Sequence, residues 1–282
     1  PLSDPMLFFP PAKLNLGLHV LGKRSDGFHN LESVFLPTQW TDVLEVRLTE
    51  GALGSLEFTT SGLDIPGTTE GNLVVRAHDM LAERHALPGL HVHLHKVIPM
   101  GAGLGGGSAD GTYALMAMND VCGLGMSGED LAPWAASLGS DCPFFLHSKP
   151  ALVSGRGEVI APLKFGLPLD GWWLVIHHPG IHVCTAEAFG ALTPAHRHTD
   201  WAKLSTTEVG RWSDLIRNDF EPGIAAVHPE VQHALNQMKA SGAHYAQMTG
   251  SGSAVFGLFE SELEARAVDL NHGHTHVGLA IA

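Results

Sequence analysis

The sequence predicts an α+β fold, and three observations lead to this prediction. Residues 12–20 and 90–97 alternate apolar and polar side chains, as strands with one buried face do. Further strand-like segments that look antiparallel are mixed with helical ones, which is typical of α+β proteins. A glycine-rich stretch at 101–107 joins a strand to a helix. We place a domain boundary between Pro162 and Pro168, which gives domains 1–163 and 164–282.

The first half of the chain begins with the strand 12–20. Its apolar face carries leucines and a valine, and its other face carries Lys13, Asn15 and His19. Asp26-Gly27 is a turn signal. Next come strands near 31–36, 42–48 and 55–60, a helix from Asn72 to Arg84, and the strand 90–97, whose polar face holds His91, His93 and His95. We expect Ser108 to cap a helix that runs to about 122, and Ser127, with Asp130 three residues later, to cap a helix over 128–138.

The second half contains both hairpin and helix signals. A hairpin is expected around Gly155–Gly157, a strand at 172–176 and a short helix from Thr185. Residues 229–240 predict a helix, because Val231, Leu235 and Met238 have helical spacing. A second Gly/Ser loop at 249–253 precedes a strand at 254–259, a helix near 261–271 and a last strand.

The composition excludes some classes of partner. With 16 basic and 29 acidic residues the formal charge is −13, and charged residues are only 16% of the chain. Such a field repels polyanions, so we expect no nucleic acid and no anionic membrane as partner. The three cysteines form no CxxC pair, no apolar run approaches the length of a membrane span, and no secretion signal is visible. These features predict a cytoplasmic protein.

The loop that starts at Pro99 is the strongest chemical signal. Five glycines in the seven positions 101–107 let the backbone approach a ligand closely, and the following helix start favours an anion. A flexible loop is the alternative, but the placement between strand and helix favours phosphate binding. The Gly-Lys-Ser/Thr of a Walker A loop is missing. The dinucleotide fingerprint Gly101-x-Gly103-x-x-Gly106 lacks its context, because Asp120 lies in a helix instead of at a strand end.

Six motifs, in order, resemble those of a known enzyme family. Three of them, Pro11–Leu16, Pro99–Asp110 and Thr249–Ala254, resemble the three motifs of the GHMP kinases, which are ATP-dependent small-molecule kinases. The other three, Gly22–His29, Leu138–Phe144 and Asn218–Glu221, resemble the family within it that phosphorylates a cytidine-diphosphate-linked methylerythritol for isoprenoid synthesis. The resemblance spans residues 11 to about 257, and it implies the two-domain GHMP kinase fold with the active site in a cleft between the domains.

The resemblance also implies a role for each matching residue. Asp141 is the catalytic base, and Lys13 is the cation that pairs with it. ATP, with Mg²⁺ expected, binds Asn72, Lys96, Pro99, Met100, Gly101, Ala102, Gly103, Leu104, Gly105, Gly106, Gly107, Ser108 and Ala109, of which Ser108 is a candidate Mg²⁺ contact. The cytidine-linked polyol binds Asn15, Phe28, His29, Asp141, Thr185, Phe189, Gly250, Ser251 and Gly252, with the base sandwiched between the two phenylalanines. The family usually has tyrosine at position 28 and often serine at position 109.

Each of these residues also has an ordinary structural alternative. Asp141 is a helix-capping or turn aspartate, and Lys13 and Lys96 are strand charges. Asn72, Ser108 and Thr185 are helix caps, and the phenylalanines are core. The histidine stretches 91–95 and 272–276 could hold zinc, but a solvated strand face is favoured. Another GHMP kinase, of mevalonate, homoserine or galactose type, and a non-catalytic nucleotide-binding module are the rival functions. The chain is expected to be a monomer or a homodimer.

Overall fold

The computed structural model describes residues 4–192 and 199–281, and within them the α+β prediction is confirmed. The backbone forms two compact units, each made of several stretches of chain. The first unit contains residues 1–12, 40–100 and 105–148, and the second contains 13–39, 101–104 and 149–282. The sequence predicted one boundary near residue 163, whereas the contacts divide the chain discontinuously, because long strands pass from one unit into the other.

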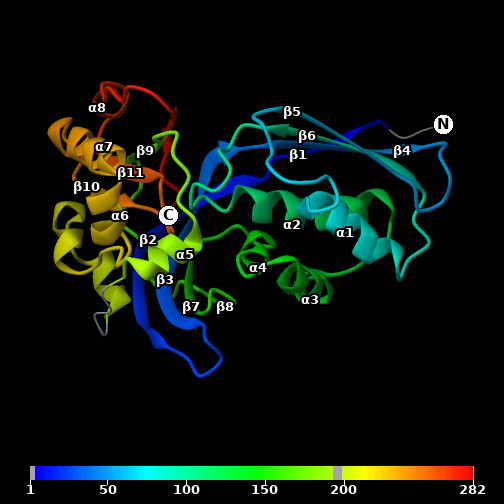
Figure 1. Ribbon diagram of the computed structural model, residues 1–282, viewed down its shortest axis with the longest axis horizontal. Helices are drawn as coiled ribbons and strands as arrows, with labels where there is room; N and C mark the ends of the chain where they lie inside the picture. Colours follow the sequence, from blue (N-terminus) through cyan, green and yellow to red (C-terminus); the bar gives the residue numbers. More distant parts are fainter. Residues whose placement is uncertain (1–3, 193–198, 282) are drawn as a thin grey trace. The chain divides into compact units, whose positions relative to one another are not determined.

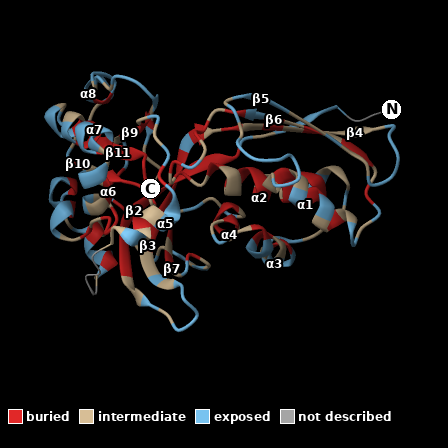
Figure 2. Ribbon diagram, in the orientation of Figure 1, coloured by how far each residue is buried: buried red, intermediate tan, exposed pale blue. Residues whose placement is uncertain are grey.

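The first unit is a four-stranded sheet with helices on one face (Figure 1). The strand order is β1 (Met6–Phe8), β4 (Val43–Thr49), β6 (Gly89–Lys96) and β5 (Leu56–Gly62), and only the β5–β6 pair is parallel. The apolar face of β6 packs against α1 (Leu73–Ala82) and α2 (Gly106–Val121). Figure 2 shows this buried layer between sheet and helices. The alternation in 90–97 therefore predicted its buried face correctly.

Local signals account for the ends of these helices. Asn72 caps α1 by accepting a hydrogen bond from the Val74 N–H at 2.9 Å. Ser127 and Asp130 form the predicted capping box at the start of α3 (Gly128–Leu138). The helix α4 (Cys142–Phe145) follows Asp141 and was not predicted, because four residues carry no periodic pattern.

The second unit holds the other two sheets. One has the order β2 (Pro11–Lys23), β3 (His29–Thr41), β7 (Ala151–Gly155) and β8 (Val159–Pro162), with the hairpin predicted at 155–157. The other has the order β10 (Tyr245–Met248), β11 (Val255–Phe259), β9 (Trp173–His178) and β12 (His274–Leu279). The helical elements are α5 (Thr185–Gly190), η1 (Trp201–Ser205), η2 (Val209–Asp214), α6 (Glu221–Val227), α7 (Pro229–Ala240) and α8 (Glu262–Arg266).

Several local predictions for this unit need correction. The strand β2 is buried on both faces, Lys13, Asn15 and His19 included, because the polar side chains find partners in the tertiary structure. Cys184, not Thr185, occupies the N-cap position of α5. The helix expected at 261–271 is only five residues long. His272 has φ +66° and precedes β12, so it does not share a strand face with His274 and His276.

The histidines of β6 form a hydrogen-bonded chain with the neighbouring strand instead of a merely solvated face. Arg47 Nε lies 3.3 Å from His91 Nδ1 and can only donate, so the proton of a neutral His91 sits on Nε2. Thr59 Oγ1 lies 3.4 Å from that Nε2 and 2.8 Å from His93 Nδ1. Ser61 Oγ then lies 2.8 Å from His93 Nε2. Each hydroxyl accepts a hydrogen bond from one imidazole and donates one to the next. Arg47 therefore sets the donor-to-acceptor direction of the whole series of hydrogen bonds.

We expect the neutral form of His91, His93 and His95 to carry its proton on Nε2, since Ser61 Oγ continues the series of hydrogen bonds 2.9 Å from His95 Nδ1. Nitrogen-15 NMR of the imidazoles at neutral pH measures this directly, because protonated and bare ring nitrogens have very different shifts. In an Arg47→Met variant, His91 should be the first of the three residues to lose its preference for a proton on Nε2 over one on Nδ1. A proton on Nδ1 of any of the three residues in the unaltered protein would contradict the assignment.

Candidate active site

The glycine-rich loop has the backbone that its composition predicts. Gly101, Gly103 and Gly105 have φ values of +65°, +77° and +70°, which side-chain-bearing residues rarely adopt. Gly105 is the N-cap of α2, and no side chain caps this helix. Ser108 is therefore the third residue of the helix and not its cap, which corrects the sequence prediction. The first N–H groups of an α-helix have no acceptor within the helix, and the helix dipole favours an anion at this end.

The first glycine loop packs against the second one through segments 101–104 and 249–254. The Ala254 N–H donates to the Ala102 carbonyl at 3.1 Å. A Cβ added to Gly103 would overlap the carbonyl oxygen of Thr249, and one added to Gly250 would lie 2.8 Å from the Gly103 carbonyl oxygen. The two backbones thus approach more closely than any side chain would allow.

Replacing Gly103 with alanine is expected to damage both loops. The positive φ alone costs about 1–2 kcal/mol for a residue with a Cβ, and the overlap with Thr249 adds to this cost. We expect a lower free energy of unfolding in denaturant titrations and a raised KM for ATP. The matched control is Gly166→Ala, because a Cβ at Gly166 would have no atom within 4 Å. Equal stability and KM for the two variants would contradict the close packing of the loops.

Lys13 is held within a network on β2. Its Nζ donates to Asn15 Oδ1 at 2.6 Å and lies 4.6 Å from the centre of the Phe35 ring. Asn15 Nδ2 donates to Ser33 Oγ at 2.9 Å, and the Asn15 N–H donates to Thr249 Oγ1 at 2.9 Å. With 4% of its surface exposed, Lys13 is not a solvated strand charge. Its ammonium is oriented by Asn15, and Asn15 is tied to the second glycine loop.

Asp141 directly precedes the short helix α4. It occupies the N-cap position, with φ −82° and ψ −16°, but its side chain makes no capping hydrogen bond. The helix-cap alternative for this carboxylate is therefore wrong. Asp141 lies in the first compact unit and Lys13 in the second, and their pairing stays a prediction.

Lys96 lies in a buried cluster beneath the start of α2. Its Nζ contacts Asp42 Oδ2 at 2.5 Å and Asp110 Oδ2 at 2.8 Å, and only 1% of the residue is exposed. Asp42 Oδ1 also accepts the N–H groups of Val97 and Ile98. A Cβ on Gly106 would lie 3.0 Å from Lys96 Nζ. The ammonium is covered and paired, so the solvated strand-end alternative is wrong, and a direct adenine contact has no support in this geometry.

Burial governs the charges of this cluster. Burial raises the pKa of Asp110 to about 7, and Lys96 opposes this shift while Asp42 adds to it. Burial would lower the pKa of Lys96, but the two carboxylates outweigh it and the pKa is raised. Lys96 thus remains an ammonium ion. It joins the end of β6 to Asp42 and to Asp110 of α2.

Comparisons with known proteins show the family to which this chain belongs. Residues 72–149 match the family model for the GHMP kinases N terminal domain, and residues 200–270 match that for the GHMP kinases C terminal. The 4-diphosphocytidyl-2-C-methyl-D-erythritol kinase of Parabacteroides distasonis is 40% identical over 90% of this chain and 92% of its own. The chain belongs to this family of GHMP kinases. The kinase of the same name from Porphyromonas gingivalis is 40% identical over 91% of this chain and 93% of its own.

Solved structures agree with this assignment. A crystal structure of 4-(cytidine 5'-diphospho)-2C-methyl-D-erythritol kinase is 29% identical to this kinase, with a TM-score of 0.82 over 98% of this chain and 100% of that one. Homoserine kinase from Cytophaga hutchinsonii, 20% identical with a TM-score of 0.69 over 99% and 96% of the two chains, shares the fold. The protein is thus a small-molecule kinase of the GHMP type, with ATP as co-substrate.

The residues predicted to hold a cytosine lie in the second unit of this kinase. Phe28 is 53% exposed in the turn after β2, where the Arg156 guanidinium lies 4.6 Å from its ring centre. The His29 ring stacks on Phe189, with centroids 4.6 Å apart and planes inclined by 22°. Phe28 and Phe189 thus have other partners here, and neither is fully buried core. Thr185 is exposed at the first position of α5.

The motif Asn218–Glu221 supports the second glycine loop of the kinase. The sequence had suggested no role for these four residues. Asn218 Nδ2 donates to the Met248 and Gly250 carbonyls, each at 2.8 Å. Asp219 Oδ2 accepts the Val20 N–H at 2.9 Å, and Glu221 Oε2 accepts the Met248 N–H at 2.7 Å. Only the family motif signals these roles in the sequence, because the partners lie 27 to 199 positions away.

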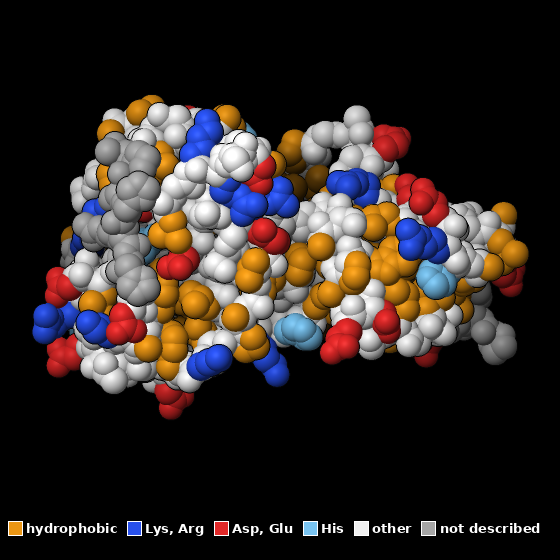
Figure 3. Space-filling model, turned by 90° about the horizontal axis from the view of Figure 1, so that it is seen from below, with side chains coloured by type: hydrophobic (Ala, Val, Ile, Leu, Met, Phe, Trp, Pro, Cys, Tyr) orange, Lys and Arg blue, Asp and Glu red, His pale blue; other side chains and the backbone are white. Residues whose placement is uncertain are grey.

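The rest of the described surface adds no other binding chemistry of the kinds that the sequence raised. In residues 4–192 and 199–281, no helix is long and apolar enough to cross a membrane, and no three His, Cys, Asp or Glu residues converge as metal ligands. On the face shown in Figure 3, Lys and Arg side chains stand singly or in small groups among carboxylates. That face is not the continuous basic stripe of a nucleic-acid-binding surface.

Proposed function

We propose that this kinase transfers the γ-phosphoryl group of ATP to the 2-hydroxyl of 4-diphosphocytidyl-2-C-methyl-D-erythritol, a step of non-mevalonate isoprenoid synthesis. The single observation that carries the proposal is the 40% identity, over about nine tenths of both chains, to kinases named for this substrate. The turn with Phe28 and His29 supports it, because the mevalonate, homoserine and galactose alternatives have no base to stack there. A cytoplasmic location and a monomeric or homodimeric state remain predictions.

The proposed ATP site is the backbone of the first glycine loop, from Pro99 to Ala109. Three glycines with positive φ and the uncapped start of α2 present N–H groups to phosphate oxygens. Asn72 is already engaged in capping α1, so it would place the helix beside the nucleotide instead of binding through a free amide. Backbone N–H groups suit a chain of charge −13, since few cations are available.

The proposed chemistry uses Asp141 and Lys13 as the predicted pair. Asp141 accepts the proton of the substrate hydroxyl as the hydroxyl oxygen attacks the γ-phosphorus, and the bond from that phosphorus to the β-phosphate oxygen breaks to release ADP. Lys13, oriented by Asn15, offsets the negative charge that develops on the transferred group. Phosphoryl transfer depends mostly on such positioning and charge stabilisation. Gly250, Ser251 and Gly252 would then support the substrate from the second loop.

A magnesium ion fits this site only as a companion of ATP. The described residues offer no cage of three carboxylates or imidazoles. Mg²⁺ normally keeps several waters and binds through phosphates and one or two protein oxygens, and the Ser108 hydroxyl in the first turn of α2 would be such an oxygen. When bound with ATP, the ion neutralises charge on the phosphates.

Removing the ring of Phe28 is expected to weaken binding of the cytidine substrate. Stacking on an aromatic ring is worth about 1–3 kcal/mol per base, so Phe28→Ala should raise the substrate KM roughly fivefold to a hundredfold and leave the KM for ATP unchanged. Phe28→Tyr is the matched control, because it keeps the ring and restores the residue that the family usually has. An unchanged KM for the cytidine substrate in the alanine variant would show that Phe28 does not bind the cytosine.

The test of the proposed function is ATP turnover on a panel of alcohols. The cytidine-linked substrate should be phosphorylated, and mevalonate, homoserine and galactose should not. Turnover of one of those alcohols alone would support the corresponding rival kinase. ATP binding without turnover of any substrate would support the nucleotide-binding module instead.

A further inference from the structure

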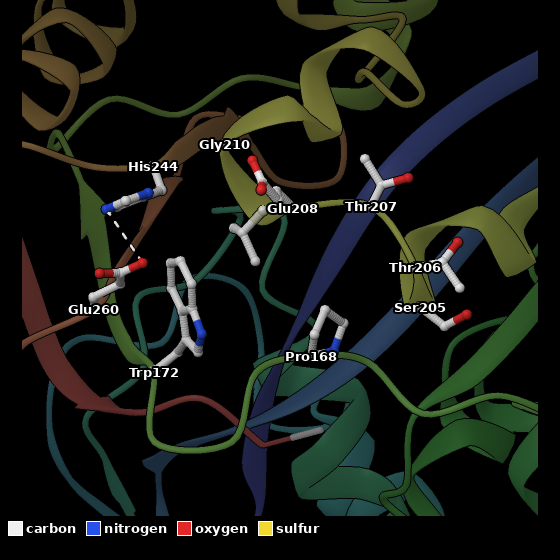
Figure 4. Close-up of a pocket in the computed structure, with 10 residues that line it drawn as sticks. Pro168, Trp172, Ser205, Thr206, Thr207, Glu208, Gly210, His244 and Glu260 are labelled. Carbon is white, nitrogen blue, oxygen red and sulfur yellow. Dashed lines mark ion pairs between the residues drawn. The ribbon is translucent and has the colours of Figure 1, made fainter.

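A pocket lies within the second unit and shares no residue with the glycine loops (Figure 4). Its volume is about 570 Å³, within the range of small-molecule sites. Pro168 and Trp172 line it before β9, and His244 and Glu260 line it beside β10 and β11. The segment 205–210, from the last residue of η1 to the first two residues of η2, also lines it. The proposed kinase reaction uses none of these residues.

The indole of Trp172 is the fixed element of this pocket. The Trp172 N–H donates to the Leu169 carbonyl at 3.1 Å, and the Trp172 carbonyl accepts the Ala280 N–H at 2.9 Å, so the backbone is held on both sides. The His244 ring meets the indole edge to face, with centroids 5.1 Å apart and planes at 85°. In the view of Figure 4 the indole stands between Glu260 and Pro168, with Glu208 across from it. A rigid aromatic surface is thus presented to the pocket.

The charges of the lining are of one sign. Two carboxylates, Glu208 and Glu260, line the pocket, and none of its ten lining residues is a lysine or arginine. The one ion pair recorded among these residues is the long contact of 3.9 Å between His244 Nε2 and Glu260 Oε1. In the described part of the chain, Glu208 has no recorded ion pair or hydrogen bond from its side chain. The nearby Thr207 hydroxyl adds an acceptor for an N–H group.

We propose that this pocket binds a small organic ammonium ion with an apolar or aromatic body. The apolar body packs on the indole, Val209 and Pro168, while the ammonium group lies near the carboxylates. Glu208 and Glu260 are solvent-exposed, so they attract the ammonium group from solution, and the indole attracts a nearby cation through its quadrupole. The overall charge of −13 favours the approach of a cation as well.

Titration of the full-length protein with phenethylammonium chloride tests the proposal, with 2-phenylethanol as the uncharged probe of similar shape. Calorimetry gives the affinities, and NMR shift changes of the six tryptophan indoles, assigned with Trp172→Phe, locate the site. The ammonium ion should bind saturably and at least tenfold more tightly than the alcohol. Glu208→Gln should weaken its binding roughly fivefold to thirtyfold, and added salt should weaken it further.

Glu230→Gln is the matched control, because Glu230 is an exposed glutamate of the same unit outside this pocket. It should bind the ammonium ion as the unaltered protein does. Kinase activity should be retained in both glutamine variants, which shows that they are folded. The proposal is overturned if the alcohol binds as tightly as the ammonium ion, if neither probe saturates, or if Glu208→Gln and Glu230→Gln behave alike. None of these outcomes bears on the kinase reaction, which is assayed separately.

Discussion

Asp141→Asn is expected to lower the turnover number by about a hundredfold to ten thousandfold, while the affinity for ATP stays within about twofold. A positioned general base contributes a factor of this size, and the amide keeps the shape of the carboxylate without its ability to accept the proton. The side chain does not cap α4, so the substitution removes no helix-capping bond. Single-turnover phosphorylation of the cytidine substrate measures the chemical step, and equilibrium titration with ATP measures binding.

Asp120→Asn is the matched control, because it removes one carboxylate from the exposed end of α2 in the same unit. Its turnover should match that of the unaltered enzyme. Near-normal single turnovers in Asp141→Asn would exclude Asp141 as the base. A parallel loss of ATP affinity would instead mean that the residue supports the fold of the site.

The largest effect on stability is expected from Lys96→Met. Removing one partner of a buried ionic cluster typically costs about 3–5 kcal/mol, because the remaining charges stay buried without compensation. Here two carboxylates, Asp42 and Asp110, would be left facing each other. Denaturant unfolding should show this loss, whereas Lys149→Met, at an exposed lysine, should change the free energy of unfolding by less than about 0.5 kcal/mol. Equal effects of the two substitutions would contradict the structural role of Lys96.

A second substitution separates charge from packing in this cluster. Adding Asp110→Asn to Lys96→Met removes a buried carboxyl group that would lie beside Asp42 without a cation, and it should recover part of the lost stability. The pH dependence gives an independent test. The pKa of Asp110 is raised in the folded protein to about 7, so the folded state holds this proton more strongly than the unfolded state does. Its contribution to the free energy of unfolding therefore declines as pH rises from about 4 to about 7, and Asp110→Asn alone should remove that decline.

Local patterns predicted much of the fold because their causes are local. The capping box of Ser127 and Asp130, the cap by Asn72 and the buried face of β6 all depend on residues within a few positions of one another. The start of α2 was predicted three residues late for the same reason. Serine is a common cap, but here Gly105 takes that position with a left-handed backbone, because the loop turns tightly just before the helix.

Contacts between distant residues were not predictable in the same way. The strand β2 is buried on both faces, and Asn218 donates hydrogen bonds to the second glycine loop. Neither feature produces a periodic pattern in the sequence. Lys96 illustrates the difference most clearly. The family resemblance suggested a place near the nucleotide, whereas its ammonium is buried between Asp42, 54 positions away, and Asp110, 14 positions away.

The sequence by itself determined the family, the glycine loops and the choice of Asp141 and Lys13 as candidates, because these rest on residue identity and short spacing. Only the tertiary structure decided which polar side chains are engaged in holding the loops together. The physical reason is burial: a buried charge or amide must find a partner, and that partner comes from wherever the fold brings one close. In this chain of net charge −13, Lys96, one of few lysines, forms such a structural contact. That leaves Lys13 as the cation we assign to the transferred phosphoryl group.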